Sequence, residues 1–255
     1  MIDLHSHILP GLDDGPQTLE ECAAMLRMAA EAGTTDIVAT PHANLQFPFQ
    51  PELIEEKIAE LGRACGPILR IHRGCDFHLS YDNIQDALAN PTRYTINQKN
   101  YLLVEFSDLL IAKTIDEILF RLREAGITPI VTHPERNWLL QQRVEQLHTW
   151  VLNGCLIQVT AQSFWGRFGP EARRFCRELM RRDLVHFVAS DAHDCADRPP
   201  RLDTAYQHIA KKYGEERAQR LLVKNPRTVL EGQPWEGEPD PAPATPPRKW
   251  YEFWV

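Results

Sequence analysis

Short apolar runs alternate along the chain with longer segments in which apolar residues recur every three or four positions. The short runs have the length and β-branched content of buried strands, and the longer segments have the period of amphipathic helices. Because strand and helix alternate in strict turn, we expect a parallel sheet with helices packed against it. Strands are predicted near residues 2–4, 36–39, 68–73, 101–105, 128–132, 155–159 and 186–190. Helices are predicted over residues 18–33, 51–63, 114–125, 144–152, 170–182, 202–212 and 215–222.

The strand count indicates the fold class. Seven strand segments with intervening helices predict an α/β protein with a distorted (β/α)7 TIM-like barrel, one strand short of the eight-stranded form. The alternating pattern ends near residue 232. Residues 233–255 are rich in proline and finish in an aromatic stretch, so we expect one barrel domain over residues 1–232 and a tail over the remainder.

Composition and charge narrow the class of protein. The chain has 255 residues, 43% of them hydrophobic, and a formal net charge of -7 at pH 7, which disfavours nucleic acid as a partner. No apolar run approaches the roughly 20 residues that span a bilayer, and the amino terminus lacks the basic and apolar regions of a secretory signal. We therefore expect a cytoplasmic protein without membrane insertion. The six cysteines form no CxxC pair, which predicts free thiols.

Metal-binding side chains follow the predicted strands at their carboxyl ends. A closed parallel barrel gathers these ends into one cup, and an extended H-x-H pair presents both imidazoles on one face. A lone histidine is more simply explained as a hydrogen-bonded core residue, but this recurrence favours a polynuclear metal hydrolase. Carboxylates that converge in a cup would repel one another unless cations were bound. The candidate ligands are His5, His7, Asp14, His42, Asp76, Glu105, His133, Asp191 and His193.

Two arginines accompany these ligands. Arg136 follows His133 by three residues and Arg198 follows His193 by five, so both belong to loops at the same rim. A guanidinium group matches phosphate oxygens in a bidentate way. We interpret both arginines as phosphate clamps, although each would be an ordinary surface residue without the neighbouring ligands.

Four sequence motifs together resemble a known family. They are DLHSHILPGLDDG at residues 3–15, ATPH at 39–42, THPER at 132–136 and SDAH at 190–193. In this order they are similar to motifs of the polymerase-and-histidinol-phosphatase (PHP) superfamily, and more narrowly of the bacterial PHP-type protein-tyrosine phosphatases of capsule and exopolysaccharide loci. The resemblance covers residues 2 to about 232. It departs at Asp76, where the family more often has glutamate.

The resemblance implies a site with three divalent metal ions. One ion would be held by His5, His7, Asp76 and Asp191, the second by Asp76, Glu105 and His133, and the third by Asp14, His42 and His193. Imidazole and carboxylate ligands without thiolate suit manganese, the expected metal, and also iron or zinc. The implied substrate is phosphotyrosine on a protein, in particular the tail of a bacterial tyrosine autokinase that controls capsule and exopolysaccharide synthesis.

Parts of the sequence are also compatible with three other functions. The same site could act on a small phosphate ester such as histidinol phosphate, or the chain could be a non-catalytic regulatory partner of a kinase. A thiol phosphatase of the C-x5-R type matches formally at Cys176 with Arg182 and at Cys195 with Arg201. The first pair lies in a predicted helix, and the second encloses two prolines that lack the amide donors of a phosphate loop.

Aromatic residues near the predicted rim bear on specificity. Phe47 and Phe49 follow His42, and Phe164 and Trp165 follow the sixth predicted strand. The sequence leaves two interpretations open: these rings stack on a phosphotyrosyl ring, or they cap the barrel as apolar lid residues.

Overall fold

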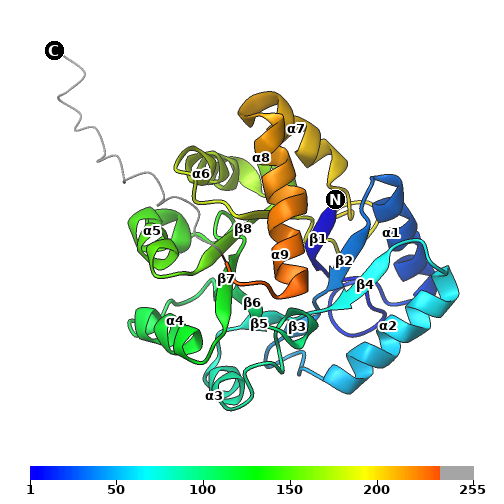
Figure 1. Cartoon of the computed structure of the whole chain (residues 1–255), viewed down its shortest axis with the longest axis horizontal. Coiled ribbons are helices and arrows are strands. Elements are labelled where there is room, and N and C mark those ends of the chain that lie inside the picture. Colours follow the sequence, from blue (N-terminus) through cyan, green and yellow to red (C-terminus); the bar gives the residue numbers. More distant parts are fainter. Residues whose placement is uncertain (236–255) are drawn as a thin grey trace.

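The computed structural model describes residues 1–235 (Figure 1), so the predicted tail lies outside the described residues apart from positions 233–235. The strands are β1 (Ile2–Ser6), β2 (Asp36–Ala39), β3 (His42–Ala43), β4 (Arg70–Arg73), β5 (Asp76–His78), β6 (Tyr101–Glu105), β7 (Thr128–Thr132), β8 (Leu156–Thr160) and β9 (Phe187–Ala189). The α-helices are α1 (Leu19–Glu31), α2 (Pro51–Cys65), α3 (Tyr81–Ala89), α4 (Ile115–Glu124), α5 (Val144–Leu152), α6 (Gly169–Arg181), α7 (Asp203–Tyr213), α8 (Glu215–Gln219) and α9 (Asn225–Glu231). Short turns of other helix types are η1 (Ile96–Gln98), η2 (Leu140–Gln142), η3 (Ala161–Trp165) and η4 (Arg220–Lys224).

The helices form close to the predicted positions, with two corrections. α1 begins with the expected capping box, in which Thr18 Oγ1 accepts from the Glu21 amide and the Glu21 carboxylate accepts from the Thr18 amide. α3 was not predicted; its nine residues bury only Ile84 and Ala87. The helix predicted to end at residue 222 instead continues through the π turn η4 into α9. A π turn shifts the hydrogen bonding by one residue, which interrupts the 3.6-residue period.

All strand pairs are parallel, in the orders β1-β2-β4 and β3-β5-β6-β7-β8-β9. The pairing of β2 with β4 resumes between β3 and β5 in unchanged register, since Ala39 pairs with Arg73 and His42 with Asp76. Gly74 permits this passage, because a Cβ there would lie 2.6 Å from Val38 Cγ1. β3 and β5 therefore extend β2 and β4, and the seven predicted strand positions and the α/β class are confirmed.

The two sheets also meet beside β1 and β9. Ser6 forms a parallel bridge with Ala192, the His7 amide donates to the Ala192 carbonyl at 2.8 Å, and the Asp191 amide donates to the His5 carbonyl at 2.9 Å. The strands thus follow one another around a ring, with most of the helices on the outside (Figure 1). This arrangement brings residues from the two ends of the sequence together at the carboxyl ends of the strands.

Apolar side chains fill the ring and its amino-terminal end. Leu4, Tyr101 and Phe187 belong to one buried cluster that also contains Val229 and Leu230 of α9. α9 packs against β1 and η1, so it covers the amino ends of the strands. A second and larger cluster lies between the strands and the surrounding helices. The carboxyl ends are left for polar side chains. Among the described residues, no helix combines the length and the apolar character required to span a membrane.

Candidate metal centre

All nine predicted ligands lie at the carboxyl ends of the strands, and the structure brings them together. His5 lies near the end of β1 and Glu105 ends β6, whereas His42 and Asp76 begin β3 and β5, which continue β2 and β4 beyond their carboxyl ends. The remaining ligands lie on the loops that follow β1, β7 and β9; they are His7, Asp14, His133, Asp191 and His193. Six of the nine residues are buried, His42 and Glu105 are partly exposed, and the Asp14 side chain is 54% exposed.

The first group of potential ligand atoms contains His5, His7 and Asp76. His5 Nε2 lies 3.3 Å from His7 Nε2 and 3.5 Å from Asp76 Oδ2. Asp191 Oδ1 lies 3.4 Å from His5 Nε2 and 3.5 Å from His7 Nε2. These are the four side chains that the family resemblance assigned to one ion.

The second group contains His42, Asp76 and Glu105. His42 Nδ1 lies 3.2 Å from Asp76 Oδ2 and 3.7 Å from Glu105 Oε2, and His133 Nε2 lies 3.8 Å from Glu105 Oε1. The family resemblance had assigned His42 to a different ion. His78 was not predicted at all, yet its Nδ1 lies 4.0 Å from Glu105 Oε2. Its position at the end of β5, two residues after Asp76, is the signal that could have identified it.

The third group contains His7, Asp14, His42 and His193. Asp14 Oδ1 lies 3.4 Å from Nε2 of both His42 and His193. The predicted trio is therefore together, and His7 joins it from the first group. Because His7 and His42 each belong to two groups, the three groups form one continuous cluster.

Unsatisfied buried atoms show that divalent cations fit this donor set. Both carboxylate oxygens of Asp76 and the Nδ1 of His42 are buried without a hydrogen-bond partner in the structure. Such atoms are costly unless something else satisfies them. The donors are imidazole nitrogens and carboxylate oxygens without thiolate, a combination that suits zinc, iron or manganese. The central position of Asp76 is consistent with its predicted bridging role.

Two of the five non-glycine residues with positive φ in the described part of the chain are ligands. His133 has φ 32° and Asp191 has φ 52°, values that side-chain-bearing residues rarely adopt. Each residue lies just after a strand, β7 for His133 and β9 for Asp191. Strained conformations persist where the surroundings impose them, and they cluster at functional sites.

Two residues that the sequence analysis missed orient the histidines. Asp13 Oδ2 lies 2.6 Å from His7 Nδ1 and accepts from the His42 amide at 3.1 Å, and Gln158 Oε1 lies 2.9 Å from His5 Nδ1. Each contact turns the Nε2 of the histidine toward the cluster. Outer partners of this kind fix the tautomer and the ring orientation of metal-binding histidines. The signal for Asp13 was its place beside Asp14 in the LDDG sequence.

His5 and His7 lie next to each other in the cluster, but their pKa values are shifted in opposite directions. Burial would lower the pKa of His5, but the carboxylates of Asp191 and Asp76 outweigh it and raise that pKa to about 9. Burial dominates at His7 and lowers its pKa to about 4, although Asp13 opposes this shift. Burial beside Asp76 raises the pKa of Glu105 to about 8. Loss of hydration is the larger cause of this last shift, and repulsion from the Asp76 carboxylate adds to it.

Arg136 and Arg198 both contact Asp191. Arg136 donates to Asp191 Oδ2 through Nη1, and Arg198 donates to the same oxygen through Nη2 at 2.6 Å. The other oxygen of Asp191 faces the histidines. The guanidinium of Arg136 also lies 4.3 Å from the ring centroid of Phe168. The two arginines therefore stand at the edge of the ligand cluster, as predicted from their loops.

The four aromatic residues predicted at the rim differ in burial and in their packing partners. Phe164 is buried in the core and packs against His208, and Phe49 is partly buried and packs against Tyr94 with ring centroids 4.7 Å apart. Phe47 faces His42 with ring centroids 6.1 Å apart. Trp165 is 42% exposed.

The thiols do not form a phosphatase site. All six cysteines are free. Cys176 is buried in α6, and burial raises its pKa well above the usual value. Cys195 is exposed, and the partial loss of hydration around its thiol still raises its pKa. A nucleophilic cysteine needs a lowered pKa.

Sequence comparisons identify relatives along nearly the whole chain. A sequence model of the CpsB/CapC family, described as capsular polysaccharide synthesis, matches residues 1–231. The tyrosine-protein phosphatase CpsB of Streptococcus pneumoniae is 34% identical over 242 residues, which cover 91% of this chain and 99% of that protein. The tyrosine-protein phosphatase YwqE of Bacillus subtilis is 30% identical over 237 residues, which cover 91% of this chain and 92% of that protein.

Solved structures of two of these relatives share the fold of this chain. The crystal structures of YwqE from Bacillus subtilis and CpsB from Streptococcus pneumoniae are described as those of unique metal-dependent tyrosine phosphatases. The match to them has a TM-score of 0.88 at 29% identity and covers 96% of this chain and 100% of the matched chain. A lactonase from Listeria monocytogenes matches with a TM-score of 0.57 at 12% identity over 90% of this chain and 94% of that one, a likeness of fold alone.

Proposed function

Since the chain belongs to the CpsB/CapC family of capsular polysaccharide synthesis, we propose that it is a metal-dependent protein-tyrosine phosphatase. It hydrolyses the phosphate ester of phosphotyrosine on a protein substrate. The observation that supports this most is the continuous cluster of three ligand groups at the carboxyl ends of the strands. The names of the relatives support the choice of phosphotyrosine.

The cluster would hold three divalent ions, with manganese as the expected metal. His5, His7, Asp76 and Asp191 would hold the first ion; Asp76, Glu105 and His133 the second; Asp14, His42 and His193 the third. His42 is also close enough to Asp76 to contribute to the second ion. Bound divalent ions supply Lewis-acid polarisation of the phosphoryl group and a nucleophile at neutral pH.

The protein side chains would bind and orient the phosphate. Arg136 and Arg198 stand together beside Asp191, where their N–H groups can reach non-bridging phosphate oxygens. Asp13 and Gln158 keep His7 and His5 in fixed orientations. Tyrosine has a hydroxyl pKa of about 10, so phenolate can leave without a strong proton donor.

The physiological partner would be a phosphotyrosyl protein, and we infer that it is the tail of a bacterial tyrosine autokinase that controls capsule or exopolysaccharide synthesis. An extended segment can carry a phosphorylated side chain into an open site. The half-exposed Asp14 supports this, since it leaves one side of the cluster accessible. A cytoplasmic location is part of the same proposal.

One set of measurements on the purified protein tests the proposal. We expect about three equivalents of metal by elemental analysis and much faster release of phosphate from a phosphotyrosyl peptide than from the matched phosphoseryl peptide. A chelator, given time to remove metal, should abolish activity, and added manganese should restore it. Cys195→Ser, which removes the exposed thiol, serves as the control and should leave the rate unchanged.

Opposite results would reject separate parts of the proposal. Full activity in excess chelator would reject metal dependence. Equal rates on the two peptides would reject the choice of tyrosine, and a strong preference for histidinol phosphate would support the small-ester alternative instead.

A further inference from the structure

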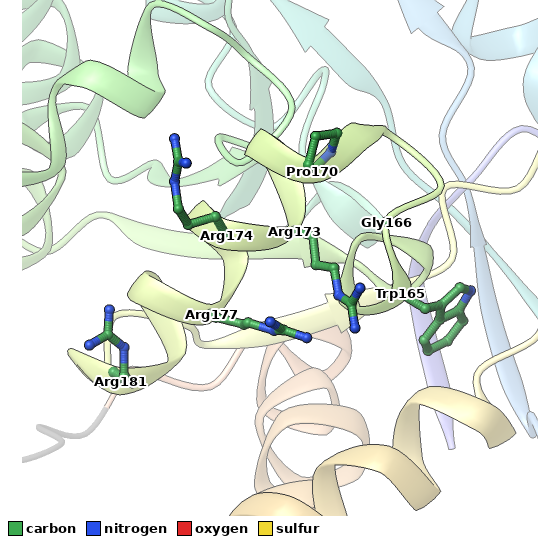
Figure 2. Close-up of a pocket in the computed structure, with 7 residues that line it drawn as sticks. All are labelled: Trp165, Gly166, Pro170, Arg173, Arg174, Arg177 and Arg181. Atoms are coloured by element: carbon green, nitrogen blue, oxygen red, sulfur yellow. The ribbon is translucent and has the colours of Figure 1, made fainter.

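A groove of about 620 Å³ lies beside η3 and along α6 (Figure 2). Its lining contains one exposed aromatic side chain, Trp165, and four arginines of α6. The arginines are Arg173, Arg174, Arg177 and Arg181. The chain as a whole carries a net charge of -7, so this concentration of cations runs against its overall charge.

Two of the four arginines are not neutralised. Arg174 pairs with Glu171 and Arg181 with Glu178, one helical turn away in each case. Within residues 1–235, no carboxylate pairs with Arg173 or Arg177, and the buried Nε of Arg177 has no hydrogen-bond acceptor. The guanidinium groups of Arg173 and Arg177 therefore carry positive charges that no carboxylate of residues 1–235 neutralises, and they are the groups of this lining that a bound anion would pair with.

Arg173 and Arg177 act as a pair because residues four apart share one face of a helix. Figure 2 shows both side chains extending from α6 on the side of Trp165, whereas Arg174 points away from them. Lys212 of α7 adds to the same positive field. Burial lowers the pKa of His208 on that helix, and Lys212, Arg177 and Arg173 lower it further.

The segment 162–168 connects the groove with the metal-ligand cluster. On the cluster side, Phe168 lies under the guanidinium of Arg136, and Arg167 donates to the Asp197 carbonyl next to Arg198. On the groove side, Trp165 and Gly166 form one wall. A polypeptide laid across this short segment would touch both places.

We propose that this groove docks a second phosphotyrosine of the same protein substrate, while the first one occupies the metal-ligand cluster. The inference rests on the proposed function. Paired guanidinium groups match the oxygens of a phosphate dianion, and the exposed indole of Trp165 offers a surface on which a tyrosyl ring can stack. The preferred substrate is therefore a segment that carries at least two phosphotyrosines.

The experiment compares three peptides of the same sequence on the metal-loaded, full-length protein. Each has one hydrolysable phosphotyrosine and, at a graded series of spacings, a second position occupied by tyrosine, phosphoserine or a non-hydrolysable phosphonate analogue of phosphotyrosine. At the best spacing we expect the phosphonate to lower KM by about tenfold relative to tyrosine, the effect of one or two charge-assisted hydrogen bonds. Phosphoserine, which lacks the ring, should give a smaller gain.

Matched variants assign the effect to the groove. Arg173→Gln with Arg177→Gln should remove the gain and leave kcat/KM for the singly phosphorylated peptide unchanged. Arg121→Gln, an exposed arginine of α4, is the control and should keep the gain. Because Arg177 is half-buried, thermal melting should accompany the assay, and Arg173→Gln alone replaces the double variant if that variant unfolds.

The outcomes separate this inference from the proposed function. No gain at any spacing, or a gain that survives the loss of the groove arginines, would overturn the docking site while the phosphatase assignment stands. No turnover of any phosphotyrosyl peptide by the wild-type protein would overturn both.

Discussion

Asp36→Asn should destabilise the fold without altering the ligand cluster. Asp36 begins β2, at the end of the strands opposite to the cluster, and its side chain is fully buried. Its carboxylate accepts from Arg70 Nε at 2.7 Å and Nη2 at 2.9 Å, and from Thr35 Oγ1 at 2.8 Å. It also lies 2.9 Å from His72 Nε2 and 3.3 Å from Arg227 Nη2. Asparagine keeps the shape but removes the charge and one acceptor oxygen.

The expected loss follows from these contacts. Each hydrogen bond to a charged group contributes about 1.5–3 kcal/mol when buried. The Arg70 side chain is 66% exposed, so solvent screens its pairing, and the remaining contacts are partly retained by the asparagine oxygen. We therefore expect the free energy of unfolding to fall by about 2 kcal/mol, equivalent to a Tm lower by about 4–8 °C for a domain of this size.

The effect should depend on pH in a defined direction. Burial would raise the pKa of Asp36, but hydrogen bonds from Arg70 and His72 outweigh it and hold the pKa below its usual value. A carboxylate with a lowered folded-state pKa adds stability above its unfolded pKa of about 3.9 and loses that contribution as the pH falls through the folded value. The difference between wild type and Asp36→Asn should be full at neutral pH and narrow below about pH 4.

Chemical denaturation of both proteins at several pH values, in excess chelator, measures this difference. Glu56→Gln, an exposed position on α2, is the control and should change stability by less than about 0.5 kcal/mol. Unchanged stability of Asp36→Asn at neutral pH would refute the reasoning, as would a difference that persists undiminished at low pH.

Three further predictions concern the ligand cluster. Asp76→Ala should lower the bound metal by elemental analysis more than Asp14→Ala does, because Asp76 contacts two ligand groups; equal metal contents would place the bridge elsewhere. Arg136→Ala and Arg198→Ala should keep their metal but each lose about 2–3 kcal/mol in kcat/KM, and wild-type kinetics would make them ordinary surface arginines. Asp13→Asn should weaken metal affinity in a titration by about 10–100-fold through its effect on His7, and an unchanged affinity would contradict an orienting role.

The sequence determined the fold class and the location of the cluster. Strand and helix periods are local properties, so the alternation of short apolar runs and amphipathic segments was readable without tertiary information. Polar residues placed just after each run then had to meet, because parallel strands end on one side of a barrel. This is why residues as far apart as His5 and His193 could be assigned to one site, where both approach Asp191.

Only the tertiary structure decided which side chains belong to two ligand groups and which charged side chains pair with one another. His42 bridges two ligand groups because β3 continues β2 past Pro41, a turn that no periodic pattern encodes. Asp191 faces the histidines with one oxygen and both arginines with the other, because the ring brings the loops after β7 and β9 together.

The rim aromatics also show what a local sequence pattern determines and what only the fold determines. Phe164 and Trp165 are adjacent in sequence, and their composition left the core and substrate interpretations equally open. The last turn of η3 buries Phe164 against α7 and exposes Trp165 beside the arginines of α6. Burial depends on the neighbours that a folded chain supplies from distant segments, so a local pattern could place these rings at the rim but not choose the side each one faces.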